Sequence, residues 1–166
     1  MLRINTLTAL KLMLFALILI GLAGCTAYKP APAPTGFEGS WLGLGKNQIP
    51  NTLVNQREIG FMLMLNAQGK VKGYIGDAVI NDTVLLKPNW LMSLFGKKEY
   101  KINCTLKGQI IQRENISRPS GTIVITGLDK GELLCSFLSS GPKDNTRNQA
   151  MSVTDIRLKK VAEAPF

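Results

Sequence analysis

Histidine is missing from the 166 residues of this chain, and this absence limits the chemistry that the sequence can support. The usual serine and cysteine hydrolases need an imidazole as general base, so their catalytic triads are excluded. Three cysteines are also too few for a closed structural zinc site, which takes four ligands. We therefore expect no metal site and no cofactor.

Four aspartates are the remaining candidates for acid–base catalysis. Gly76-Asp77, Asn81-Asp82 and Leu128-Asp129 are expected at turns, and Asp155 lies near the end of the chain. An Asp side chain in such a segment commonly bonds to the local backbone. No Gly-x-Ser-x-Gly nucleophile motif accompanies them. We interpret them as turn residues, predict no catalytic residue and expect the protein not to be an enzyme.

Cys25 follows a segment with the three parts of an export signal. Arg3 and Lys11 are basic, residues 12–20 are all apolar, and small residues come next. This order is typical of a secretory signal peptide. The uncharged stretch over residues 12–24 is too short for an ordinary transmembrane helix, which needs about 20 residues.

Leu22-Ala23-Gly24-Cys25 resembles the lipobox of bacterial lipoproteins at every position. The resemblance implies cleavage between Gly24 and Cys25, a lipid on the Cys25 thiol and export to the cell envelope. Acyl chains anchor a protein because each buried CH₂ contributes about 0.8 kcal/mol. Thr26, rather than Asp, follows the cysteine, which implies the outer membrane facing the periplasm if the host is Gram-negative. An uncleaved membrane helix ending at Cys25 is the alternative.

Cys104 and Cys135 are the two thiols that remain if Cys25 carries lipid. Both fall on the apolar side of an alternating segment, and an exported protein meets an oxidising compartment. A disulfide between Cys104 and Cys135 is therefore one hypothesis. Two separate buried thiols are the alternative, because a simple meander places two strands between the cysteines, whereas bridged Cα atoms lie within about 7 Å.

Basic residues outnumber acidic ones, and the formal net charge is +9. Lysines gather in two segments of the sequence: Lys97, Lys98, Lys101 and Lys107, and then Lys159 and Lys160. Nucleic acid is not an expected partner of an exported protein. Anionic lipid or lipopolysaccharide is the expected contact, and an ordinary solvated basic face is the alternative. The sequence identifies no protein partner.

The elements that position these residues are predicted to be short β-strands. Apolar residues alternate with others in three segments, and glycine-containing turns separate the remaining ones. Strands are expected over residues 59–65, 71–75, 83–87, 100–107, 109–113, 122–126, 132–138 and 151–160. Only residues 90–95, between Pro88 and Gly96, are expected to form a helical turn.

This spacing of about ten residues per strand favours an all-β fold, a small antiparallel meander barrel of about eight strands. A β-sandwich is the alternative. Gly39-Ser40-Trp41 resembles the Gly-x-Trp start of lipocalins, which implies a lipocalin-like barrel with Trp41 at its closed end. The residues expected to face the core or a ligand are Trp41, Phe61, Leu63, Ile102, Leu106 and Phe137.

Three segments make up the predicted domain organisation. Residues 1–24 form the signal peptide, residues 25–36 a lipidated proline-rich tether and residues 37–166 a single β-domain. The Pro-Ala-Pro-Ala-Pro sequence at residues 30–34 favours an extended polyproline II spacer. At about 3.1 Å per residue, the tether would hold the domain up to roughly 30 Å from the membrane.

The leading functional hypothesis is a membrane-anchored bacterial lipoprotein whose β-barrel binds an apolar ligand or an envelope partner. The alternative is a structural, envelope-assembly or protein-inhibitor lipoprotein with no internal ligand. A cavity distinguishes the two, since an eight-stranded barrel can either hold one small ligand or be filled by its own side chains.

Overall fold

A computed structural model describes residue 11 and residues 28–48, 58–96, 98–112, 117–141 and 150–162. Cys25 and the predicted cleavage site lie outside the described residues. The elements, in chain order, are β1 (Tyr28–Pro30), β2 (Gly39–Asn47), β3 (Glu58–Leu65), β4 (Lys70–Ile75), β5 (Ala78–Pro88), α2 (Trp90–Leu94), β6 (Tyr100–Lys107), β7 (Ser120–Asp129), β8 (Glu132–Ser139) and β9 (Ser152–Val161).

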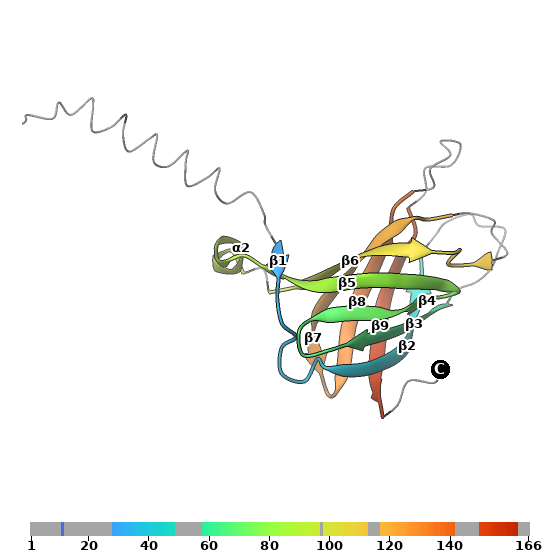
Figure 1. Cartoon of the computed structure of the whole chain (residues 1–166), viewed down its shortest axis with the longest axis horizontal. Coiled ribbons are helices and arrows are strands. Elements are labelled where there is room, and N and C mark those ends of the chain that lie inside the picture. The colour runs from blue at the N-terminus through green and yellow to red at the C-terminus, as the bar shows by residue number, and fades with distance from the viewer. Residues whose placement is uncertain are drawn as a thin grey trace, which may run out of the picture.

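The strands β2 to β9 close into an antiparallel meander barrel (Figure 1). Each of these strands pairs with the one before and the one after it, and β9 returns to pair with β2. The pairing of β5 with β6 leaves no open edge among them. The prediction of a small barrel is therefore confirmed, and the alternative β-sandwich is wrong because every strand of the ring has two hydrogen-bonded neighbours.

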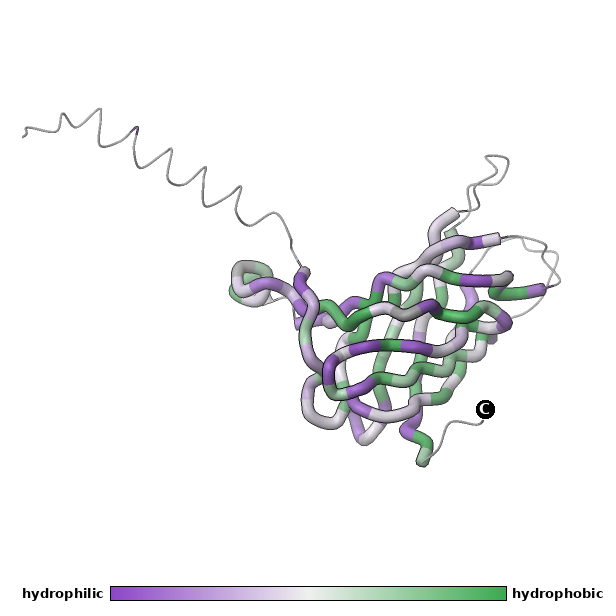
Figure 2. The backbone as a smooth tube through the Cα atoms, viewed as in Figure 1, coloured by the Kyte–Doolittle hydropathy of each residue, from purple (hydrophilic) through white to green (hydrophobic). Residues whose placement is uncertain are grey.

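Alternating side chains explain why these segments form the barrel wall. In β6, Ile102, Cys104 and Leu106 are buried while Asn103 and Thr105 are exposed. Successive side chains of a strand point to opposite faces, so such a segment has one face for the core and one for solvent. The same alternation of polar and apolar residues follows the strands in Figure 2.

Two local predictions are wrong. Residues 81–82 are not a turn before a short strand, because β5 continues through them and bulges against both of its neighbours. Residues 109–112 are not a strand either. Ile110 and Ile111 are adjacent and both buried, and this segment pairs with no strand of the barrel. This pair covers the end of the barrel at which Asp77 donates its backbone amide to Ile110 O at 3.1 Å.

The segment from residue 28 to residue 37, here called the strap, lies against the barrel instead of forming a tether. Tyr28 to Pro30 pair with the end of β5. Ala31 then donates its amide to Leu85 O at 3.0 Å, and Ala33 donates to Ala67 O at 3.2 Å. Proline has no N–H, so the two alanines carry the only backbone donors of residues 30–34. The predicted tether is therefore at most residues 25–27, which lie outside the described residues.

The strap closes one end of the barrel, here called the strap end. Phe37 is buried there, and its ring meets the ring of Tyr100 edge to face at 5.5 Å. Trp41 is buried beneath it and donates its indole N–H to Phe37 O at 2.8 Å. β2 begins and β5 ends at this end, so α2 also lies here, beside β1 (Figure 1).

Candidate functional site

The interior of the barrel is the first place to look for a ligand site, and its six predicted residues are all buried. Trp41, Phe61, Leu63, Ile102, Leu106 and Phe137 are between 0% and 6% exposed. The rings of Phe61 and Phe137 meet across the interior at 5.9 Å between centroids, with an angle of 67° between their planes. All six belong to the buried core of the barrel.

Side chains fill this interior. Leu63, Ile102 and Ile125 are 0% exposed, so a water molecule touches them neither from outside nor from a cavity within. Glycines make room for the bulkier groups: a Cβ at Gly121 would overlap the ring of Phe137. Eight-stranded barrels are narrow enough for such filling. Within the described part of the chain, the core is continuous and leaves no chamber for an apolar ligand.

Cys104 and Cys135 are both buried and both free, so the disulfide hypothesis is corrected to its alternative. Cys104 lies opposite Gly121 of β7 and Cys135 opposite Ile125 of the same strand. β7 therefore stands between them. Two strand spacings amount to about 9.6 Å, before their offset along the strand is added. A disulfide requires Cα atoms within about 7 Å.

Burial also makes these thiols poor nucleophiles. Burial raises the pKa of Cys135 from 9.0 to about 12. It raises the pKa of Cys104 to about 11, although the hydrogen bonds with backbone groups, including Gly121 O at 3.2 Å, oppose the rise. Only the thiolate form of a cysteine is nucleophilic, and a raised pKa keeps a thiol protonated. Neither residue has the electropositive, exposed setting of a reactive cysteine.

The aspartates are dispersed over the barrel. Asp77 lies in the β4–β5 turn, Asp129 ends β7 at the opposite end, and Asp155 faces solvent within β9, where it pairs with Lys46 at 3.9 Å. Asp82 lies within β5 rather than at a turn. Among the described residues, no three cysteine or acidic side chains form a group that could hold a metal ion.

The sequence interpretation missed one spacing that can support catalysis. Ser140 and Lys143 have the Ser-x-x-Lys spacing. Ser140 Oγ donates to Ser120 O at 2.9 Å, and its oxygen lies 3.3 Å from Ser120 N. Lys143 lies outside the described residues. The described contacts of Ser140 are those of a side chain that joins two chain segments at the barrel end.

The lysine clusters of the sequence do not form one patch. Lys101 is the second residue of β6, at the strap end, whereas Lys107 ends this strand at the far end, opposite Val79. Lys159 pairs with Glu132 at 3.7 Å. Lys160 lies over the Trp41 ring at 5.7 Å from its centroid. Lys97 lies outside the described residues.

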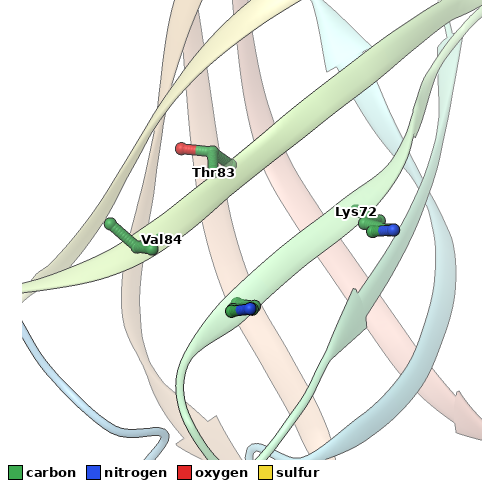
Figure 3. A pocket seen from close by; sticks show the side chains of 4 residues that line it. Lys72, Thr83 and Val84 are labelled. Carbon is green, nitrogen blue, oxygen red and sulfur yellow. The ribbon is translucent and has the colours of Figure 1, made fainter.

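The outer wall carries a shallow hollow of about 220 Å³ between β4 and β5 (Figure 3). Its lining residues are Lys70, Lys72, Thr83 and Val84. Thr83 donates its hydroxyl to Asn103 O at 2.6 Å, which fixes this side chain beside the bulge of β5. The ammonium groups of Lys70 and Lys72 suit contact with an anionic group of a partner. The alternating lysines of β4 were visible in the sequence, but the bulge was not.

The strap end carries the most exposed large apolar side chains. Trp90 is 70% exposed, Leu94 73% and Phe95 76%. These three residues are called the apolar tip below. The helix α2 that carries two of them is capped, because Asn89 Oδ1 accepts a hydrogen bond from Met92 N at 2.9 Å. The sequence predicted this helical turn but not its exposure.

Comparisons with protein-family models, with curated proteins and with solved structures found no match for this chain. In the described residues, none of the helical segments has both the length and the hydropathy that a membrane crossing requires.

Proposed function

We propose that the chain is a bacterial lipoprotein, exported and held in the cell envelope by lipid on Cys25, whose β-barrel binds an envelope partner on its outer surface. Leu22-Ala23-Gly24-Cys25 and the basic and apolar residues before it support the anchor. Because Thr26, rather than Asp, follows Cys25, the proposed location in a Gram-negative host is the outer membrane, facing the periplasm.

The filled interior is the observation that carries the functional part of the proposal. An apolar ligand inside the barrel would need the space that Phe61, Leu63 and Phe137 occupy. Binding therefore falls to the outer wall and the barrel ends. The structural, assembly or inhibitor role weighed from the sequence needs no cavity either, so the same outer surface serves it.

A non-enzymatic role belongs to the same proposal. The chain has no histidine. The carboxylates of Asp77 and Asp129 lie at opposite ends of the barrel, where they cannot act on one substrate. Cys104 and Cys135 are buried with raised pKa values. On the outer wall, the hollow lined by Lys70 and Lys72 is the place proposed for an anionic group of the partner.

The anchor is tested in the full chain by Cys25→Ser, with Thr26→Ser as the matched control beside it. The wild type and Thr26→Ser are expected in the membrane fraction, with a mass that shows cleavage before Cys25 and added lipid. Cys25→Ser is expected unprocessed or released. If Cys25→Ser keeps the membrane location and mass of the wild type, the proposed anchor is wrong.

The filled barrel is tested by native mass spectrometry of residues 26–166. This piece keeps every residue of the core, which begins at Phe37 and ends at Leu158, and it keeps the strap. We expect the mass of the polypeptide alone. A stoichiometric apolar molecule that stays bound through purification would contradict the outer-surface proposal and restore an internal ligand.

A further inference from the structure

The apolar tip stands on a rigid one-turn helix. Trp90 and Leu94 are four residues apart and so share one side of α2. Gly96, with φ of 78°, donates its amide to Ser93 O at 3.1 Å and ends the helix beside Phe95. Tryptophan, phenylalanine and leucine are the side chains that enter the boundary between headgroups and acyl chains. Three of them exposed on one projection mark a surface that contacts something apolar.

The strap places this tip beside the position where the chain leaves the barrel toward Cys25. Tyr28 pairs with Pro88, and Trp90 comes two residues after Pro88. Cys25 is three residues before Tyr28, and three residues span at most about 11 Å. The same pair of strands thus fixes the tip and the end of the short linker, as the neighbouring positions of β1 and α2 in Figure 1 show.

Lysines gather at this end on the side of β1 and β5. Lys29 of β1 lies directly opposite Lys87 of β5, and both are exposed. Like charges in directly opposed positions destabilise an antiparallel pair. Lys98 is exposed nearby, Lys101 is the second residue of β6, and Glu99 is the acidic residue between them. A layer of anionic headgroups would neutralise this repulsion, since each lysine near such a surface is attracted to it.

We propose that the strap end docks on an anionic lipid bilayer, with Trp90, Leu94 and Phe95 inserted among the headgroups and Lys29 and Lys87 against the phosphates. This inference rests on the proposed lipid anchor at Cys25 and adds a second, polypeptide contact with the same membrane. Two contacts at one end orient the barrel, so its far end points away from the bilayer and its walls remain accessible to a partner.

The test uses residues 26–166, which lack the anchor, with vesicles of phosphatidylcholine alone or mixed with phosphatidylglycerol. The chain has two tryptophans, of which Trp41 is 1% exposed. Binding to the anionic vesicles should shift the Trp90 emission to shorter wavelength, and brominated acyl chains should quench it. Trp90→Phe should still co-sediment with the vesicles but lose the spectral shift.

Two variants separate the tip from general surface hydrophobicity. Replacing Trp90, Leu94 and Phe95 together by serine should lower the partition coefficient by about tenfold or more. Leu44→Ser with Leu138→Ser is the matched control, because these side chains are 56% and 55% exposed on the barrel wall. This control should bind as the unchanged protein does. Lys29→Gln with Lys87→Gln should weaken binding only to anionic vesicles.

Several outcomes would overturn the inference. Equal binding by the tip variant and the unchanged protein would show that the tip does not insert. Equal binding to neutral and anionic vesicles would remove the role of the lysines. A Trp90 shift that depends on protein concentration without vesicles would identify a second copy of the chain as the occupant. Because this piece lacks Cys25, none of these results bears on lipidation, which Cys25→Ser tests separately.

Discussion

At the scale of single residues, Cys104 and Cys135 show how a barrel wall can separate two thiols that have similar sequence surroundings. Both lie on apolar faces, as their alternating segments predicted, and both are buried. Their distance depends on which residues of β7 each one faces, and no local pattern specifies that register. The sequence could therefore predict the burial of the thiols but not whether they meet.

The raised pKa values give a direct prediction for both thiols. In the native protein at pH 8, we expect neither Cys104 nor Cys135 to react with a disulfide reagent such as Ellman's reagent, because burial holds their pKa values at about 11 and about 12. After unfolding in denaturant, each molecule of residues 26–166 should release two equivalents of the reagent's thiolate product, one for each cysteine. Rapid reaction of either thiol in the native state, or no free thiol after unfolding without a reductant, would contradict this.

The same shift predicts a pH dependence of stability. The folded pKa of each thiol lies above its value of 9.0, so the protonated form is favoured by folding. This contribution is fully present below about pH 9 and is lost as the pH rises through the folded values. Replacing Cys104 and Cys135 by alanine should therefore flatten the alkaline decline in the free energy of unfolding, measured by urea titration. An unchanged decline would show that other groups cause it.

The two tryptophans form a natural pair for a stability test. Trp41→Phe removes the indole N–H that bonds to Phe37 O and leaves a small gap beneath the strap. We expect it to lower the free energy of unfolding by about 1–3 kcal/mol. Trp90→Phe should change it by less than about 0.5 kcal/mol, because Trp90 is mostly exposed. Equal losses in denaturant titrations would contradict the different burial of the two side chains.

At the scale of elements, the strap explains the largest departure from the sequence interpretation. Alternating proline and alanine predict an extended segment, and residues 30–34 are extended. An extended segment can remain free or pair with the edge of a strand. It pairs only if a strand from another part of the sequence has an unpaired edge within reach. Here β4 ends its pairing at Val84, which leaves the last residues of β5 open to β1. The composition of residues 30–34 cannot predict that β5 has an open edge.

The strap makes a close approach to Gly69 that can be tested. A Cβ at Gly69 would overlap Ala31 O, and φ there is +77°. We expect Gly69→Ala to push the strap outward and to speed amide hydrogen exchange at Ala31 and Ala33. Gly131→Ala is the matched control, because Gly131 has φ of +80° but open space at the Cβ position. Equal exchange in the two variants would show that backbone strain, and not the contact, governs the strap.

The other elements were predicted where polar and apolar residues alternate strictly. β6 follows this pattern and has the expected bounds, and β8, whose burial alternates although its residue types do not, differs from its expected bounds by one residue. The prediction failed at Ile110 and Ile111, whose two adjacent buried side chains cover a barrel end. It also failed at residues 81–82, where turn-forming residues lie inside β5 as a bulge. End caps and bulges are tertiary features, so single segments do not show them.

At the scale of the whole molecule, closure by β9 determines whether the barrel exists. β9 pairs with both β2 and β8, so its loss would leave two long edges unpaired. Such edges promote aggregation. We expect a chain of residues 26–150 to lack a cooperative thermal transition in circular dichroism. A chain of residues 26–162, which keeps β9, is the control and should melt cooperatively. Cooperative melting of the shorter chain would contradict the role of β9.

The pairing of β2 with β9 also determines the earliest time at which the barrel can close. Gly43 lies opposite Leu158, so the first strand of the ring has no second neighbour until the ribosome has made the last one. At about 5–20 residues per second, synthesis of the chain from Gly43 to Leu158 takes roughly 6–23 seconds. The barrel therefore cannot close before its last strand has been made, whether the chain folds during synthesis or after export.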